Sequence, residues 1–424
     1  MTAMPPGAGY ARELREHWRY WLGAACGLSV GIATQSYSNN LFAPHMIAEF
    51  GWSRATFALQ GTLSVAMFFI VPVIGRLTDL FGSRTIASVG VIGLPLAYLA
   101  FSLQDGSMPM FFALSIFKML IGATTASIVY SRVVALQFTV ARGLALAICA
   151  SAPAAFMIAF VPVLGVLIEE HGWRNGYRVL AIVALVIGLF AVAIIPGEAR
   201  READAETQRA PVRRTAKGDY GTIFQDRTFW IVMAGMFLCN APNVLVASQF
   251  GLLLVEQKIS VATVPWFISL YGASVVVGRF ACGIALDRFA PYRVAALSMA
   301  MPAIGFILMA AEFNDLWLVA VAVVFIGLAQ GAEGDLVAYL AAHYFSRALY
   351  GSVAGLISAG LALSSALGAA MLSGVLHLAD SFLPFLQIMA CTTLLGAGLF
   401  LLLRGRSKGL AFDGATLEAD GSLA

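Results

Sequence analysis

The sequence has little charge for its length. Only 12% of its 424 residues are Asp, Glu, Lys or Arg, about half of the share that is usual in soluble globular proteins. Hydrophobic residues make up 60% of the chain, which is more than the interior of a soluble domain can hold. The composition therefore argues against an ordinary soluble domain and predicts that most of the chain lies in lipid.

Cysteine and the usual signs of catalysis are also scarce. The five cysteines each stand alone within apolar segments, without the spacing of a metal site or a disulfide framework (Cys26, Cys149, Cys239, Cys282 and Cys391). We therefore expect small buried side chains, no metal and no cofactor. Basic residues do not alternate with aromatic ones, so no nucleic-acid partner is expected. Without a nucleophile–base constellation or a Walker A motif, neither an enzyme nor an ATP-driven pump is predicted.

Long apolar segments are what the sequence does contain. A helix needs about 20 mostly apolar residues to cross the hydrocarbon core. Twelve segments meet this requirement, so the predicted fold is an all-α membrane protein with 12 transmembrane helices. The segments are 20–43, 55–75, 85–104, 109–131, 143–168, 178–196, 228–254, 264–286, 293–311, 316–341, 351–377 and 382–403.

One long polar stretch divides the twelve segments into six and six. It is rich in Arg, Ala, Glu and Asp and has no apolar period, so we expect a linker. The predicted regions are a cytoplasmic N-terminal tail (1–19), a six-helix bundle (20–196), a cytoplasmic linker (197–227), a second six-helix bundle (228–404) and a cytoplasmic tail (405–424). The first region lacks an apolar core, so we interpret it as a tail and not as a signal peptide.

A short pattern occurs twice, half a chain apart. Gly75, Asp79 and Phe81 return as Gly283, Asp287 and Phe289, 208 residues later. Each copy ends one apolar segment and precedes another. The repeat predicts two copies of one membrane bundle, an architecture that is typical of transporters.

The distribution of Lys and Arg predicts the orientation. With both termini inside, most of the 26 Lys and Arg residues lie in inner loops and tails, whereas few lie in outer loops. Cytoplasmic loops carry such an excess of cations. We therefore expect both termini on the cytoplasmic side.

The repeated loops can act as gates. Glycines there permit tight turns and close approach, and Asp79 can pair with a neighbouring arginine to form a latch that breaks and reforms. The second copy would act more weakly because Ala290 replaces its second glycine. The predicted gating residues are Gly75, Asp79, Gly82, Arg84, Arg142, Gly283, Asp287 and Arg288. A charge cluster that only fixes topology is the alternative.

These motifs resemble those of a known family. Gly75–Arg84 resembles the loop signature between helices two and three of the major facilitator superfamily, and Lys118–Gly122 resembles its fourth-helix motif. The resemblance covers all twelve segments. It implies two six-helix bundles around a central cavity that opens alternately to each side. Three further segments resemble the monocarboxylate and oxalate/formate branch of that family, namely Phe50–Arg54, Tyr130–Ala145 and Gly278–Gly283.

Arg279 is the sharpest candidate for substrate binding. It lies in the middle of a predicted span, where burying a charge is costly and charged residues are functional candidates. Val71 occupies the matching position of the repeat, so the cation is specific to one half. A guanidinium pairs bidentately with a carboxylate, and the resemblance also implies an anchor here. A structural ion pair with Glu333 or Asp335 is the alternative.

Three further charged residues are candidates for proton coupling. Glu333 and Asp335 lie two residues apart on one helix, so their side chains point about 200° apart and cannot both face one site. A buried carboxyl group is suited to bind and release a proton. Lys118 lies deep in its span and can pair with a carboxylate or snorkel outward. Static pairing is the competing interpretation for all three.

Polar residues of the spans complete the candidate list. Side chains that could donate to a substrate are Tyr37, Asn40, Tyr130, Asn243 and Tyr271. Hydrogen bonds between helices explain such residues equally well.

Together these observations predict a secondary active transporter that moves a small organic monocarboxylate by alternating access with proton coupling. The alternatives are an efflux carrier for drug-like or other organic solutes with the same fold, and an organic-anion exchanger. A membrane enzyme and a channel fit less well. We expect a monomer in a bacterial-type inner membrane.

Overall fold

The computed structural model describes residues 8–138, 141–196, 216–311, 315–345 and 349–406. Every regular element in these ranges is helical. Their contacts form two compact units, which are described separately below. The first unit holds the described residues up to 196 together with Leu245–Gly272, and the second holds 216–244 together with the described residues from Ala273 onward.

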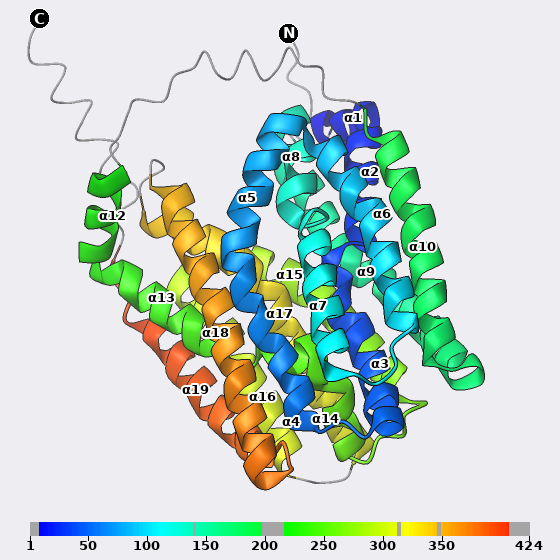
Figure 1. Ribbon diagram of the computed structural model, residues 1–424. Coiled ribbons are helices and arrows are strands. Elements are labelled where there is room, and N and C mark those ends of the chain that lie inside the picture. The colour runs from blue at the N-terminus through cyan, green and yellow to red at the C-terminus, as the bar shows by residue number, and fades with distance from the viewer. Residues whose placement is uncertain (1–7, 139–140, 197–215, 312–314, 346–348, 407–424) are drawn as a thin grey trace, which may run out of the picture. The chain divides into compact units, whose positions relative to one another are not determined.

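The first unit is a bundle of helices from the first half of the chain (Figure 1). Its elements are α1 (Ala8–Glu16), α2 (Trp18–Ser29), η1 (Ile32–Thr34), α3 (Gln35–Phe50), α4 (Arg54–Ala58), η2 (Leu59–Ser64), α5 (Val65–Phe81), α6 (Ser83–Ser102), α7 (Met108–Ala123), α8 (Ser127–Gln137), α9 (Arg142–His171) and α10 (Trp173–Ile194). The later chain adds the π turn η3 (Leu245–Gln249), α14 (Phe250–Glu256) and the first turns of α15 (Val264–Arg288).

Three predicted spans of this unit are interrupted helices, one of which is the span 109–131, divided between α7 and α8 at Thr124–Ala126. Of the other two, the first consists of α2 and α3 with the short η1 between them, and the second consists of α4, η2 and α5, with a bend of 41°. Among the described residues, ten helices are long and apolar enough to cross a membrane, and eleven if the bent pair counts as one span. The first predicted span fails this test because neither of its halves reaches the required length.

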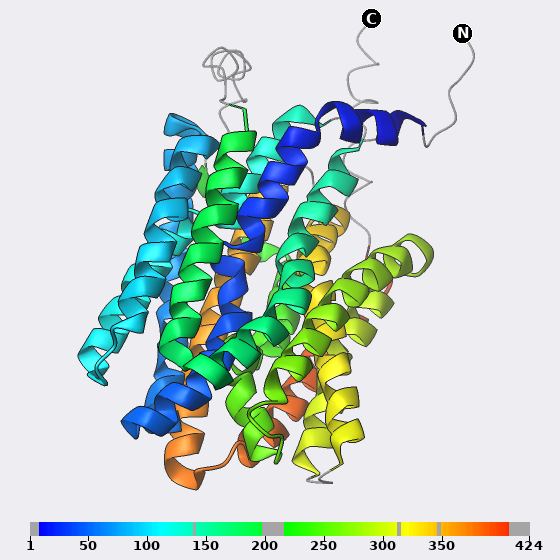
Figure 2. The ribbon, with the colours of Figure 1, turned by 90° about the vertical axis from the view of Figure 1, so that its right-hand side faces the viewer.

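Small residues let the helices of the first unit approach closely. α2 packs on α9 and α10, and α10 also packs on α6. Tyr130 of α8 is fully buried against Gly27 of α2, where an added Cβ would lie 2.3 Å from the phenol ring. Figure 2 shows α1 turning away from the direction of α2 at the end of the bundle.

The second unit is built from the later helices. Its elements are α12 (Ala216–Gln225), α13 (Arg227–Asn240), the rest of α15, α16 (Pro291–Ala310), α17 (Leu316–Tyr344), α18 (Tyr350–Ala379) and α19 (Leu383–Leu401). α16 packs on α17 and α19, while α13 packs on α18 and α19. Phe229, Met236, Leu340 and Phe400 are among the buried side chains of its core. α12 lies within the predicted linker, whose residues 197–215 are outside the described ranges.

Large apolar side chains also cover the outer faces of these helices. Phe69, Leu297 and Leu395 are each about two-thirds exposed in the isolated chain (66%, 67% and 67%). Exposed apolar surface that continues along long helices is unfavourable in water and suits a lipid environment. The composition of the chain and the apolar surfaces of its helices therefore both indicate a protein that lies in lipid.

Candidate substrate and coupling sites

Arg279 lies in the second unit beside a carboxylate. A guanidinium nitrogen of Arg279 on α15 is 3.6 Å from an Asp335 carboxylate oxygen on α17. The Arg279 side chain is 19% exposed and that of Asp335 is 36% exposed. The pair is therefore sheltered, but its acidic member remains accessible. This contact is one of the two ion pairs that the sequence allowed as the alternative to a substrate anchor.

Glycines bring the two helices of this pair into backbone contact. A Cβ added at Gly278 would lie 2.1 Å from the carbonyl oxygen of Leu328, and one added at Gly331 would lie 2.1 Å from that of Val275. Real Cβ atoms essentially never approach so closely, so both positions require glycine. This crossing of α15 and α17 lies directly beside Arg279 and one helical turn before Asp335. It therefore sets the distance between the two side chains.

The two carboxylates of α17 have different partners. Glu333 accepts a hydrogen bond of 2.8 Å from the side-chain amide of Gln330, whereas Asp335 faces Arg279. This separation follows from their spacing on a helix. Only Asp335 is in a position to respond directly to what binds Arg279.

Lys118 is a buried cation of the first unit. Its side chain is 2% exposed, and its ammonium group donates a hydrogen bond of 3.0 Å to the side-chain oxygen of Asn39. The same group lies 4.6 Å from the centre of the Phe101 ring, a cation–π contact. Within the described residues, no carboxylate forms an ion pair with Lys118. The sequence did not indicate which residue would face it.

The amide of Asn40 is occupied by backbone groups. It donates to the carbonyl oxygens of Val246 (2.6 Å) and Ser36, and it accepts from the N–H groups of Phe250 (2.6 Å) and Gly251 (3.3 Å). All of its hydrogen-bonding capacity is therefore used here. A direct contact with substrate remains a prediction that this conformation does not display.

The other predicted polar residues lie in three different settings. Tyr37 and Tyr271 face each other within the first unit, with ring centres 5.8 Å apart. Tyr130 is packed against Gly27, as described above, and the structure shows no hydrogen-bond partner for its hydroxyl group among the described residues. In the second unit the side-chain amide of Asn243 donates to Ser365 at 3.3 Å.

The structure describes only part of the predicted gates. Gly82 joins α5 to α6 with φ of 82°, a left-handed conformation that favours glycine. Gly75 packs near Ile128, and Gly283 has open space around its α-carbon. Arg84 and Arg288 are exposed. The side chains of Asp79, Arg142 and Asp287 lie outside the described residues, so the predicted latch stays a prediction.

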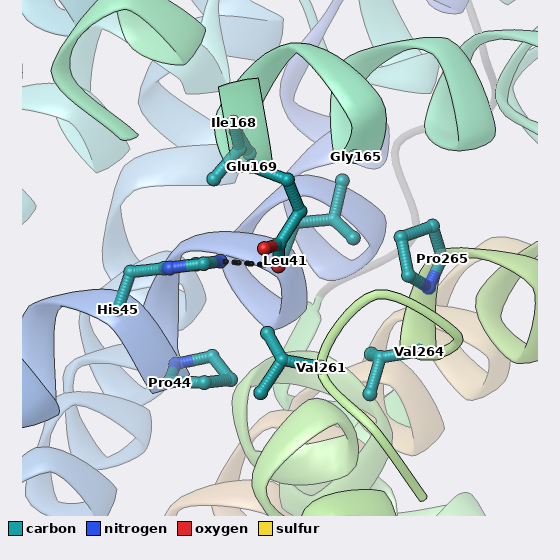
Figure 3. A pocket seen from close by; sticks show the side chains of 9 residues that line it. All are labelled: Leu41, Pro44, His45, Gly165, Ile168, Glu169, Val261, Val264 and Pro265. Atoms are coloured by element: carbon teal, nitrogen blue, oxygen red, sulfur yellow. Dashed lines mark ion pairs between the residues drawn. The ribbon is translucent and has the colours of Figure 1, made fainter. Parts of the chain in front are cut away.

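A second set of charged contacts lies at the ends of the helices that lead into the predicted outer loops. Arg54 at the start of α4 pairs with Glu256 at the end of α14, with 2.5 Å between nitrogen and oxygen. Figure 3 shows His45 and Glu169 pointing toward each other across a small pocket, 3.8 Å apart. The sequence did not predict these pairs because their members are far apart along the chain.

The pocket joins the first half of the chain to its later part. Its lining comes from α3, α9 and the residues around the start of α15 (Leu41, Pro44, His45, Gly165, Ile168, Glu169, Val261, Val264 and Pro265). A Cβ at Gly165 would lie 2.2 Å from the ring of Pro265. Residues 261–265 are thus closely seated on the first bundle (Figure 3).

Comparison with known protein families shows to which family the chain belongs. Residues 24–254 and 236–417 each match the family described as Major Facilitator Superfamily. The chain belongs to the major facilitator superfamily. Two matches to one family along a single chain agree with the internal repeat, although the two matched ranges overlap at residues 236–254. The fold is therefore the 6+6 arrangement of this superfamily, and the protein is an integral membrane transporter.

Solved structures of this superfamily share the fold at low sequence identity. A variant of the nucleoside transporter NupG aligns with a TM-score of 0.73 and 15% identity, over 91% of this chain and 99% of that one. A D-xylose–proton symporter aligns at 0.69 and 15%, over 92% and 97%. A bacterial homologue of the human lysosomal transporter Spinster aligns at 0.68 and 15%, over 92% and 97%. No curated protein matches the sequence.

Proposed function

We propose that this transporter moves a small organic monocarboxylate, that transport is coupled to protons, and that Arg279 binds the carboxylate of the substrate. The resemblance of three segments to the monocarboxylate and oxalate/formate branch supports this substrate class. We further propose a monomer in a bacterial-type inner membrane, with the bundles and tails bounded as the sequence predicts.

The observation that carries the proposal is the ion pair of Arg279 and Asp335. A guanidinium inside a membrane helix needs an anionic partner, and its partner here is already a carboxylate at 3.6 Å. A substrate carboxylate offers the same geometry and can take the place of Asp335. A cationic substrate, in contrast, would be repelled by Arg279.

The same exchange would couple substrate binding to a proton. When the substrate occupies Arg279, Asp335 loses its counter-ion, and a carboxylate without a counter-ion in this setting favours protonation. Substrate anion and proton then load together, and the site keeps its net charge. When the substrate leaves, Arg279 recaptures Asp335, which loses its proton. Glu333 and Lys118 would adjust this step without contacting the exchanged carboxylate.

Uptake of labelled monocarboxylates into proteoliposomes with an imposed inward proton gradient tests the proposal. We expect the gradient to stimulate uptake of at least one acid by the intact protein. Arg279→Ala should abolish uptake, because one lost charge-assisted pair in a membrane site costs about 2–5 kcal/mol. Asp335→Asn should retain exchange of the acid but lose accumulation driven by the gradient.

Glu333→Gln is the comparison variant: because Glu333 bonds to Gln330 and not to Arg279, it should keep accumulation driven by the gradient and change only its rate. If Asp335→Asn accumulates acid like the intact protein, Asp335 does not couple protons. Rapid counterflow without any response to the gradient would identify an organic-anion exchanger. No uptake of any acid by the intact protein would contradict the monocarboxylate assignment and direct the next assays to larger organic solutes.

A further inference from the structure

The seventh predicted span is interrupted near its middle. α13 ends at Asn240, the π turn η3 covers Leu245–Gln249, and α14 begins at Phe250. Where a helix is interrupted, backbone groups lose their regular hydrogen-bond partners. In a membrane such groups need a partner from the protein or from a water-filled cavity.

Asn40 of α3 supplies these partners. Its side-chain nitrogen donates to the carbonyl oxygen of Val246, and its side-chain oxygen accepts from the N–H of Phe250, both at 2.6 Å. In an uninterrupted α-helix these two backbone groups would bond to each other, since they belong to residues i and i+4. The amide of Asn40 is therefore inserted into the hydrogen-bond ladder of the seventh helix. It is 1% exposed.

Gly251 makes the insertion possible. A Cβ on Gly251 would lie 2.1 Å from the backbone oxygen of Asn40, so any larger residue would push α14 away from α3. The N–H of Gly251 also points at the side-chain oxygen of Asn40, at 3.3 Å. The first and seventh helices therefore meet at one place, where the backbone of Gly251 approaches that of Asn40 and the Asn40 amide bonds to residues of the seventh helix.

We infer that Asn40 is a positioning residue that completes the interrupted seventh helix, and that its withdrawal releases residues 245–256 from the first helix during transport. The inference rests on the proposed transport function. Asn40 belongs to the first half of the chain and residues 245–256 to the second, and the halves of such a transporter separate on one side in each cycle. On separation, the backbone groups of Val246 and Phe250 need water. Release is therefore tied to the entry of water on that side.

The pair of Arg54 and Glu256 provides a second fastening at the other end of α14. Its side chains are 34% and 21% exposed, so solvent already reaches this pair and weakens it. The buried hydrogen bonds of Asn40 fix the start of residues 245–256 to α3, whereas the ion pair of Arg54 and Glu256 fixes the end of this segment to α4. Breaking the ion pair alone should loosen the end of α14 and leave the π turn seated.

Hydrogen–deuterium exchange of the full-length protein in lipid nanodiscs tests the inference without any substrate. In Asn40→Ala and in Gly251→Ala, peptides that cover residues 245–256 should exchange about tenfold faster than in the intact protein, because hydrogen bonds of their amides are lost. Ser38→Ala is the matched control, since the Ser38 hydroxyl bonds to carbonyl groups of its own chain segment at Thr34 and Gln35. It should leave this exchange unchanged.

Unchanged exchange of residues 245–256 in both variants would overturn the inference. If Asn40→Ala also accelerates exchange throughout α6 and α10, the whole bundle has loosened, and the result for Gly251→Ala is then decisive. Faster exchange of residues 245–256 alone in Gly251→Ala would support the inference, and unchanged exchange of these residues would overturn it. Arg54→Glu and Glu256→Arg should each speed exchange of 252–256 only, and their combination should restore it. Since no transport is measured, a failure of the monocarboxylate assignment would leave these outcomes intact.

Discussion

At the residue scale, the side chain of Glu49 connects two helices. Its carboxylate accepts a hydrogen bond of 2.6 Å from the indole of Trp173 and pairs with Arg174 at 2.6 Å. The end of α3 is thereby tied to the start of α10. The hydrogen bond from Trp173 and, after it, Arg174 lower the pKa of Glu49 below its ordinary value of 4.5, against the opposing effect of desolvation.

The lowered pKa of Glu49 gives a prediction for acid stability. A carboxyl group whose pKa falls on folding stabilises the protein above its unfolded pKa, and this contribution disappears as the pH falls through the folded value. Glu49→Gln should therefore lower the melting temperature slightly at pH 7, with a cost below about 1 kcal/mol because the pair is partly exposed. Melting curves from pH 7 to pH 3.5 should converge below pH 4.5. A deficit that persists unchanged at pH 3.5 would contradict this account.

Individual residues also show where sequence reasoning reaches its limit. The apolar setting of Arg279 and Lys118 singled them out as buried charges without any structure. The sequence left the partner of Arg279 open between Glu333 and Asp335 and gave no partner for Lys118, which bonds to Asn39. The rotation of a helix about its own axis depends on packing against distant helices, which the sequence does not show. The spacing of Glu333 and Asp335 did predict that they face apart, since that separation follows from one helix alone.

At the scale of elements, the crossing of α15 and α17 is fixed by the backbone. Gly278→Ala would place a Cβ against the carbonyl of Leu328, and no flexible side chain can move aside there. We expect a loss of about 1–3 kcal/mol, the usual cost of overpacking, together with loss of transport through displacement of Arg279. Gly334→Ala is the matched control on α17, because its α-carbon has open space within 4 Å. Thermal unfolding measures the loss of stability and uptake measures the loss of transport. Equal stability of the two variants would contradict the close backbone contact at Gly278.

Elements were predicted well where a span is one straight helix and less well where it is broken. The segments near 85–104 and 382–403 correspond closely to α6 and α19. Predicted spans 20–43 and 55–75 are interrupted, and hydropathy cannot register this because an apolar residue scores alike in a helix, a 3₁₀ turn or a π turn. The interruptions depend on partners elsewhere in the chain, such as Thr125 near Gly31.

At the scale of the whole molecule, composition, repeat and span count predicted a transporter made of two membrane bundles, and the resemblance of Gly75–Arg84 and Lys118–Gly122 to family motifs indicated the superfamily. The substrate, in contrast, does not follow from the fold. Structures that share this fold include proteins named for nucleosides and for xylose, so the architecture serves different solutes.

The predicted orientation is also a property of the whole molecule. A protease site inserted between residues 204 and 205, inside the predicted linker, should be cut in inside-out vesicles and protected in right-side-out vesicles, because the surplus of Lys and Arg predicts that this loop is cytoplasmic. The opposite pattern would reverse the assignment. A site inserted after Gly106 between α6 and α7 should show the complementary result and serves as the control.

The close backbone contacts of Gly278 with Leu328 and of Gly331 with Val275 also bear on how this protein can diversify. Since main chain meets main chain there, the alignment of Arg279 with α17 does not depend on the size of the side chains around it. If Arg279 binds the substrate carboxylate as proposed, other residues that contact the substrate can be exchanged by natural or laboratory selection while Arg279 stays aligned. Under the proposed function, such a protein could then acquire new acids as substrates in single mutational steps, whereas a substrate of opposite charge would require a change at Arg279 itself.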